Sequence, residues 1–179
     1  VFVNGADEVT INGFTARNNI SNRFFATNVN GYTMTNLRAF KAGVYGLYAF
    51  NSIGGTMSNS VGAWNSDSAY YVGQTPVQSK PIRTTLKNLV GYGNVLGYSG
   101  TNSRYVTIQD SKFFNNGAGI VPNALDSEKF PPAENNVFTR NDTGQDVIVR
   151  SRGLVLSAFA APDPVQRRSP ITAGNEVAL

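Results

Sequence analysis

Apolar and turn-forming residues recur along most of the chain with a period of about 22 residues, a length typical of solenoid repeats. A threonine precedes Ile, Met or Leu five times, and these threonines are almost evenly spaced apart from one longer interval between Thr56 and Thr85. Three positions after each threonine stands a residue that favours a tight turn. The pairs and their turn residues are Thr10-Ile11 with Gly13, Thr33-Met34 with Asn36, Thr56-Met57 with Asn59, Thr85-Leu86 with Asn88, and Thr107-Ile108 with Asp110.

A second column of apolar residues begins another β-prone stretch in each period. It consists of Phe24, Leu47, Tyr71, Tyr98 and Ile120, and its longest interval, between Tyr71 and Tyr98, coincides with that of the threonines. We expect these residues to face inward from strands of about 3–5 residues, separated by Asn and Gly turns. Equivalent strands of stacked coils would pair in parallel, and asparagines at the same turn would form amide ladders.

The repeat predicts an all-β fold, a parallel β-helix (solenoid) of about six coils with an irregular C-terminal tail. At about 4.8 Å per coil the solenoid would be roughly 30 Å long. An antiparallel sandwich is the alternative, but its strand lengths need not repeat, so it explains the regular spacing poorly. The insertion that contains Pro76 and Pro81 is expected to form a loop outside one coil.

The composition narrows the available chemistry. The chain has 0 Cys and 0 His, which excludes disulfides, thiolate nucleophiles, histidine bases and the usual zinc, iron or copper sites. A net charge of +4 favours acidic partners such as uronate polysaccharides, nucleic acid or anionic surfaces. No Lys/Arg run with interleaved aromatics appears, so no nucleic-acid partner is expected. No apolar run reaches the ~18 residues of a membrane helix, so no membrane span is expected either.

The pattern predicts a single β-helix domain over residues 1–159, as part of a longer solenoid, and a Pro-containing tail over residues 160–179. The repeat decays after Asp142, where residues 146–149 are expected to form one more strand. Because Val1 would enter the fold directly as a strand, the ends of the solenoid would lack a covering layer. We therefore expect self-association through uncapped ends, or a tail folded against one of them.

The repeats, with their Asn turns, resemble the right-handed parallel β-helix repeats of the pectate-lyase-like superfamily. Four segments are similar to a bacterial group of secreted β-helix proteins with no assigned activity, and the resemblance covers roughly residues 1–142. These segments are Gly46-Leu47-Tyr48, residues 68–74 (SAYYVGQ), residues 97–102 (GYSGTN) and residues 119–128 (GIVPNALDSE). The resemblance implies a right-handed coil and a secreted or periplasmic location.

Alternation along the second set of strands predicts one outward polar face. If Tyr71 and Tyr98 point inward, the substrate-binding candidates Gln74, Thr101 and Asn123 face outward and stack at coil spacing. The exposed aromatic Tyr48 joins them, and the catalytic candidates Asp67, Asp126 and Glu128 lie in adjoining segments. The alternative interpretation is structural, with solvated ladder residues and an Asp126 that caps a turn. Trp64 and the Phe113-Phe114 pair are assigned to core or coil-edge packing.

The resemblance implies an extracellular carbohydrate-contacting protein, related to polysaccharide lyases and epimerases but with turnover left open. Removing the proton α to a uronate carboxylate needs a base. Without histidine, the candidates are Lys80, Arg83, Arg104, Lys129, or Tyr98 if its hydroxyl reaches solvent.

A glycoside hydrolase would instead need two carboxylates ~5–9.5 Å apart, which nominates Asp67 with Asp126 or Glu128. No cofactor or metal is expected, because calcium would require more oxygen ligands than Asp126 and Glu128 provide. A non-catalytic structural or adhesin-type module is the alternative function.

Overall fold

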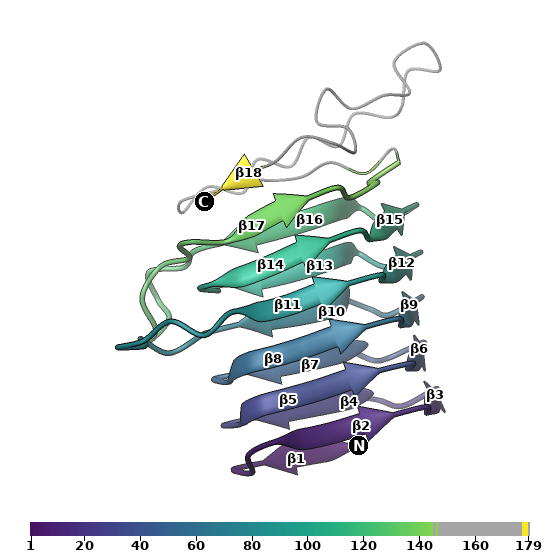
Figure 1. The fold of residues 1–179 in the computed structure, drawn as a ribbon. Helices are drawn as coiled ribbons and strands as arrows, with labels where there is room; N and C mark the ends of the chain where they lie inside the picture. Colours follow the sequence, from purple (N-terminus) through teal and green to yellow (C-terminus); the bar gives the residue numbers. More distant parts are fainter. Residues whose placement is uncertain (145, 147–176, 179) are drawn as a thin grey trace.

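Short strands joined by tight turns wind into a parallel β-solenoid of about five turns, close to the six coils expected. The structure, a computed structural model, describes residues 1–144, 146 and 177–178. Three sheets run along the stack, parallel except for the last strand of one of them, and each complete turn contributes one strand to each sheet in the order A, B, C (Figure 1). Nowhere in the described residues is there a helix long and apolar enough to cross a membrane.

The strands are three to six residues long in the solenoid body, the longest of them slightly longer than expected. Sheet A contains β1 (Phe2–Asn4), β4 (Phe24–Thr27), β7 (Leu47–Phe50), β10 (Ser68–Gly73), β13 (Leu96–Thr101) and β16 (Ala118–Asn123). Sheet B contains β2 (Val9–Asn12), β5 (Asn30–Thr35), β8 (Ile53–Ser58), β11 (Thr84–Lys87), β14 (Val106–Gln109), β17 (Val137–Thr139) and β18 (Val177–Ala178). Sheet C contains β3 (Thr15–Arg17), β6 (Arg38–Phe40), β9 (Val61–Ala63), β12 (Val90–Tyr92) and β15 (Lys112–Phe114).

The threonine column predicted from the sequence is the register of sheet B. Thr33 pairs with Thr10 and Thr56, and Thr85 pairs with Thr56 and Thr107. The turn residues that follow all have a positive φ, from 49° at Asn59 to 79° at Gly13. Asparagine, aspartate and glycine tolerate this left-handed backbone better than other residues do. The prediction of the repeat and its turns is therefore confirmed.

Asparagine side chains also form the predicted ladders. Asn36 Nδ2 donates to Asn12 Oδ1 at 2.9 Å, and at another turn Asn51 Nδ2 donates to Asn28 Oδ1 at 2.7 Å. A third ladder is buried, and in it Asn94 Oδ1 accepts a hydrogen bond from Asn65 Nδ2 at 2.9 Å. These side-chain bonds join successive coils alongside the backbone bonds of the sheets.

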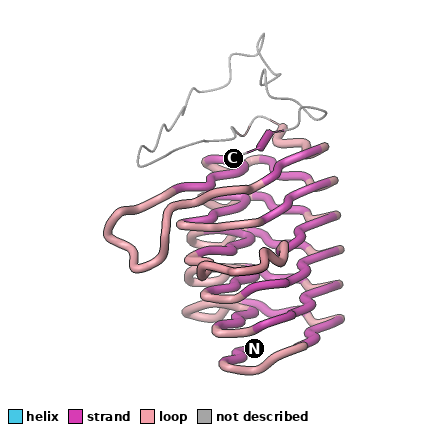
Figure 2. The backbone as a smooth tube through the Cα atoms, turned by 60° about the vertical axis from the view of Figure 1, so that its left-hand side comes forward, coloured by secondary structure: helices cyan, strands magenta, loops and turns pink. Residues whose placement is uncertain are grey.

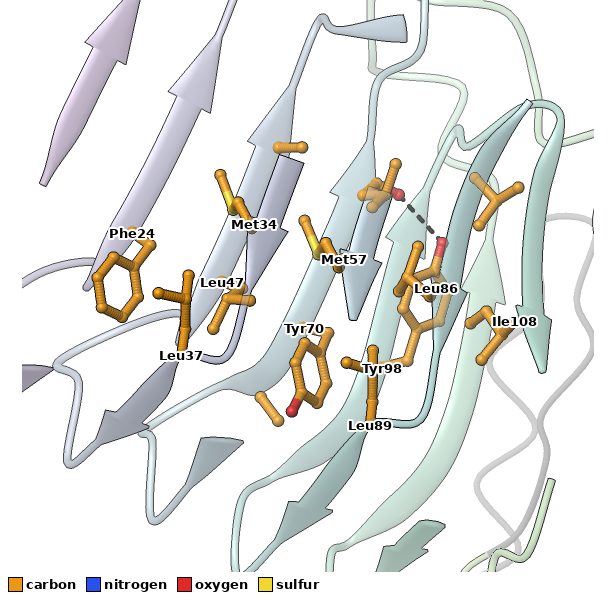
Figure 3. Close-up of a cluster of buried hydrophobic side chains, with 14 of the residues drawn as sticks. Phe24, Met34, Leu37, Leu47, Met57, Tyr70, Leu86, Leu89, Tyr98 and Ile108 are labelled. Carbon is orange, nitrogen blue, oxygen red and sulfur yellow. Dashed lines mark hydrogen bonds between the residues drawn. The ribbon is translucent and has the colours of Figure 1, made fainter. Parts of the chain in front are cut away.

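The core is a continuous stack of apolar side chains enclosed by the three sheets (Figure 3). Leu47, Leu86 and Ile108 are fully buried in it, as their inward assignment requires. The inward column of sheet A passes through Tyr70 rather than Tyr71, because Tyr70 pairs with Leu47 and Tyr98. The sequence interpretation was wrong by one residue here. The Tyr70 hydroxyl donates to buried carbonyl oxygens of Ser60 and Val90, at 2.7 and 2.9 Å, so this phenol has partners inside the core.

Two long loops lie outside the regular coils, at the edge where the sheet A strands end (Figures 1 and 2). Residues 74–83 connect β10 to β11, which confirms the predicted insertion, and residues 124–136 connect β16 to β17. At the C-terminal end of the stack, β18 pairs antiparallel with β17. Of the strand predicted at residues 146–149, all but Asp146 lies outside the described residues, as do residues 160–176 and 179 of the predicted tail.

Candidate functional site

Aromatic side chains line the outer face of sheet A. Phe2, Phe25, Tyr48 and Tyr71 occupy one outward register position on four successive coils. Further rings from neighbouring positions and from the 124–136 loop join them. We call the following set the sheet A aromatic cluster: Phe2, Phe25, Tyr45, Tyr48, Phe50, Tyr71 and Phe130.

Tyr48 lies at the centre of this cluster. Its ring stacks on Phe25 with centroids 4.3 Å apart, and it meets Tyr71 edge-on at 4.9 Å. Tyr45 lies against both tyrosines, at 4.8 Å from Tyr48 and 4.7 Å from Tyr71. The Tyr71 ring lies over Gly73, where a Cβ atom would come within 2.6 Å of Tyr71 Cε1. Glycine at position 73 therefore allows this ring to lie close to the sheet.

The 124–136 loop reaches this face because it is bound to the turn after β13. Asn102 Nδ2 donates to the Phe130 carbonyl oxygen at 2.7 Å, and the Leu125 N–H donates to Asn102 Oδ1 at 2.8 Å. The Phe130 ring then meets Phe50 edge-on, with centroids 6.0 Å apart. One asparagine in a turn thus positions the loop that carries Asp126 and Glu128 beside the aromatic cluster.

Two of the three predicted acids affect the cluster electrostatically. Burial raises the pKa of the Tyr71 hydroxyl, and the charges of Glu128 and Asp67 raise it further, while a hydrogen bond with Thr101 opposes the shift. Burial also raises the pKa of the Tyr48 hydroxyl well above its usual value, with Tyr71 and Glu128 as further causes. The hydroxyls of Tyr48 and Tyr71 are therefore protonated at physiological pH. In this neutral form the side chains can stack and form hydrogen bonds, but they cannot act as phenolate bases.

Asp67 and Glu128 approach the cluster from different elements. Asp67 immediately precedes β10 and accepts a 2.7 Å hydrogen bond from Ser68 Oγ, which orients its carboxylate. Glu128 is half-buried in the 124–136 loop, whereas Asp126 in the same loop is exposed. Asp67 and Glu128, far apart in the sequence, thus act on the same tyrosine, Tyr71.

The predicted binding residues lie on this side of the solenoid but do not form one column. Thr101 and Asn123 are in register on β13 and β16 and project outward. Gln74 lies in the turn instead, with a φ of 48°, and its N–H donates to the Thr101 carbonyl oxygen at 2.7 Å. The Asn123 Oδ1 atom is buried and has no hydrogen-bond partner among the described residues.

The proposed bases are placed less favourably. Tyr98 is fully buried and its hydroxyl donates to the Val72 carbonyl oxygen at 3.2 Å (Figure 3), so its candidacy as a solvent-exposed base is wrong. Arg104 forms an ion pair with Glu134, and Arg83 donates to Thr107 and to the Asn135 carbonyl oxygen, so both attach the 124–136 loop to the body. Lys80 and Lys129 are exposed, one on each long loop.

The sequence interpretation missed most of the aromatic cluster. Phe2, Phe25, Tyr48 and Tyr71 are equally spaced, at the period of the first coils. This equal spacing could have identified an outward aromatic column, but Tyr71 had been assigned to the inward face. The contribution of Phe130 had no such signal, because the loop that carries it is outside the repeat.

Comparison of the chain with protein-family models, with curated proteins and with solved structures finds no match. Within the described residues, no group of three or more acidic side chains could hold a metal ion.

Proposed function

We propose that the chain is an extracellular carbohydrate-contacting β-helix protein, and that a polysaccharide lies along the outer face of sheet A. The observation that supports this proposal is the aromatic cluster centred on Tyr48, with Asp67 and Glu128 beside it. Aromatic rings offer apolar faces to the C–H faces of sugars, and neighbouring polar groups bind the hydroxyls. A secreted or periplasmic location is part of the same proposal.

The other polar groups of this face suit a sugar chain that runs along the stack. Thr101 and Asn123 repeat at the spacing of successive coils, about 4.8 Å, so a polymer can meet similar groups more than once. The two long loops bound the face where the strands end and supply Lys80 and Lys129 as cations for an acidic sugar.

Catalysis is a separate part of the proposal. Asp67 and Glu128 are the pair that the site offers for glycoside hydrolysis, and a lyase or epimerase would have to use Lys80 or Lys129 as its base. We also propose that the chain is related to the polysaccharide lyases and epimerases of the pectate-lyase-like superfamily.

The experiment measures binding and turnover separately. Calorimetric titration with soluble alginate, pectate and neutral glucans should give binding to at least one polymer, and Tyr48→Thr should weaken it about tenfold or more. Phe14→Thr is the matched control, since Phe14 is an exposed aromatic residue that lies outside sheet A. Equal loss in both variants, or no binding to any polymer, would contradict the proposal.

Turnover is tested with the same polymers. Absorbance from unsaturated uronate products reports a lyase, and newly formed reducing ends report a hydrolase. Glu128→Gln and Asp67→Asn, which retain shape but not charge, should abolish hydrolysis while preserving binding. Absence of products from every polymer would exclude both reactions on these substrates and leave a non-catalytic binding protein.

A structural or adhesin-type solenoid module is the second candidate. The side-chain ladders favour it, because Asn4, Asn28 and Asn51 are joined in series by bonds of 2.7 Å along the solenoid surface and stiffen the stack. The two candidates differ on the role of Tyr48. A spacer keeps its function in Tyr48→Thr provided that the fold is intact, whereas a carbohydrate-binding face does not.

A further inference from the structure

A second group of aromatic side chains lies on the outer face of sheet C, and its charge differs from that of the sheet A face. Arg17, Phe40, Ala63, Tyr92 and Phe114 share one outward register position on five successive coils. None of the five sheet C strands contains an acidic residue, while Arg38 and Lys112 add positive charge to the same sheet. This face is therefore aromatic and basic, where sheet A is aromatic with acids beside it.

A cavity of about 370 Å³ is present on this face. Its walls are Arg17, Asn18, Phe40, Lys41, Trp64 and Tyr92, and we call it the Trp64 pocket. The Trp64 ring lies between two others, 5.9 Å from Phe40 and 5.1 Å from Tyr92. Ala63 is fully buried, and its small side chain leaves room for the indole in the aromatic column.

The backbone conformation of Trp64 indicates that packing alone does not explain the position of the indole. Its φ is 55°, a left-handed conformation that costs free energy for a bulky residue. The equivalent turn positions of other coils hold Asn18, Gly93 and Asn115, which tolerate that conformation, and Lys41, another residue of the pocket. Trp64 also leaves 52% of its surface exposed, so burial offsets only part of the cost. A strained and exposed aromatic side chain is typical of a ligand-contacting position.

Positively charged side chains line one side of the Trp64 pocket. The Arg17 guanidinium lies 5.5 Å from the centroid of the Phe40 ring, and Lys41 follows Phe40 directly. Arg23 is fully buried behind this wall, where it donates to the carbonyl oxygens of Phe40 and Lys41. Among the described residues no carboxylate lies within ion-pair distance of these three cations. Because Arg17 and Lys41 both line the pocket, an anion bound there would meet two positive charges.

We propose that the Trp64 pocket binds an anionic sugar residue, a pyranose ring that carries a carboxylate or a sulfate. The C–H face of the ring packs on Trp64, the anionic group meets Arg17 and Lys41, and the Asn18 amide binds a hydroxyl. A flat nucleobase fits less well, because Trp64 is tilted 39° from Phe40 and 82° from Tyr92, so the rings form no slot with parallel walls. This site is on a different sheet from the proposed sheet A site and does not depend on it.

Trp64 is the only tryptophan of the chain, so its fluorescence reports this pocket directly. The native protein is titrated with tetragalacturonate, a sulfated heparin tetrasaccharide, neutral cellotetraose and a single-stranded oligonucleotide. We expect a saturable change with one or both acidic sugars that weakens as NaCl is added. Affinity for cellotetraose should be weaker by about tenfold or more. No response to either acidic sugar, or tighter binding of cellotetraose or the oligonucleotide, would overturn the proposal.

Three variants test the assignment of residues. Trp64→Asn should abolish calorimetric binding of the acidic sugar without lowering the melting temperature, because asparagine occupies the equivalent turn in two other coils. The double variant Arg17→Gln with Lys41→Asn should weaken the fluorescence-detected affinity about tenfold. Lys112→Gln is the matched control, since this exposed cation is on sheet C but outside the pocket.

An equal loss in Lys112→Gln and the double variant would indicate general charge attraction and contradict a built site. The two proposals fail independently. Tyr48→Thr removes binding on sheet A and should leave the Trp64 titration unchanged, whereas Trp64→Asn should leave binding on sheet A unchanged.

Discussion

Single amide side chains connect the coils of this solenoid, and their burial decides how much each contributes. Asn94 makes the densest set of contacts, with its Nδ2 within 3.2 Å of the carbonyl oxygens of Gly62 and Tyr92 and of Asn116 Oδ1. Its Oδ1 accepts from both the N–H and the side chain of Asn65. Exposed ladders such as Asn12 with Asn36 repeat the bond but exchange it readily with water.

Asn94→Ala should therefore lower the free energy of unfolding by about 2–4 kcal/mol, because it leaves several buried polar groups of Asn65 and Gly62 without a partner. Asn12→Ala is the matched control and should cost about 0.5 kcal/mol, because its ladder bond is exposed. Urea denaturation of both variants gives the comparison. Equal costs would show that burial does not distinguish the two ladders.

Asp146 ends the buried ladder and gives it a dependence on pH. Asn116 donates to it three times, including Nδ2 to Oδ2 at 2.6 Å, yet burial raises the pKa of the Asp146 carboxyl. A carboxyl whose pKa is raised on folding stabilises the fold in its protonated form. That stability is present at low pH and is lost as the pH rises through the folded-state pKa.

Asp146→Asn should consequently be more stable than the native protein at pH 7. The difference should shrink as the pH falls and vanish below the ordinary carboxyl pKa of 3.8, where the native side chain is neutral as well. An asparagine oxygen can accept the same bonds, as Asn116 Oδ1 does from the N–H and Nδ2 of Asn94. Thermal melts of both proteins across this pH range measure the effect. A lower stability of the variant at pH 7 would mean that the charge itself strengthens the ladder.

At the scale of elements, each strand is too short to be stable alone and depends on its neighbours above and below. Inward and outward positions alternate along β7 and β11, so that Leu47 and Leu86 are fully buried (Figure 3) while Tyr48 and Thr85 beside them are only partly buried. In repeat proteins, stability is approximately a sum over such neighbouring contacts. Damage to a central coil should therefore spread to both sides.

Leu47→Ala, Leu86→Ala and Ile108→Ala should each lower stability by roughly 2–5 kcal/mol, the range typical of a cavity in a well-packed core. Val95→Ala is the control and should change stability by less than about 0.5 kcal/mol, because Val95 is half exposed. Chemical denaturation measures all four. Near-native stability of the three core variants would contradict the inward register described for β7, β11 and β14.

For the whole molecule, the stack leaves the last strand of each sheet with a free edge unless another segment pairs with it. The short β18 provides such a partner, because it pairs antiparallel with β17 through Val137 with Ala178 and Phe138 with Val177. Open edges of parallel sheets can pair with another chain. The expected self-association therefore depends on whether β18 covers the edge of β17.

Removing residues 177–179 should expose the β17 edge and increase self-association with protein concentration. Sedimentation velocity over a range of concentrations measures the change in mass, and the full chain is the reference. A truncated chain that stays monomeric and melts at the native temperature would show that β17 needs no cover.

The period, the turns and the sheet B register could be predicted from the sequence, because left-handed turn positions accept few residue types. Asparagine recurs at these turns for that reason, at Asn36, Asn59 and Asn88. Each asparagine marks the sheet B threonine that stands three positions before it. The choice between Tyr70 and Tyr71 could not be predicted in the same way. Both are aromatic and both fit alternation, and only the structure shows that it is the Tyr70 hydroxyl that reaches the carbonyl oxygens of Ser60 and Val90.

The surfaces proposed for binding were decided by the tertiary structure. The charges of Asp67 and Glu128 both raise the pKa of Tyr71, and Glu128 does so from a loop outside the repeat that Asn102 binds. No spacing in the chain predicts where such a loop ends. Arg17, Lys41 and Trp64 are separated by about one coil each, so no local run of basic and aromatic residues marks their pocket. Local backbone preference repeats along a sequence and can be predicted from it, whereas contacts between coils depend on register and loop placement, which only packing determines.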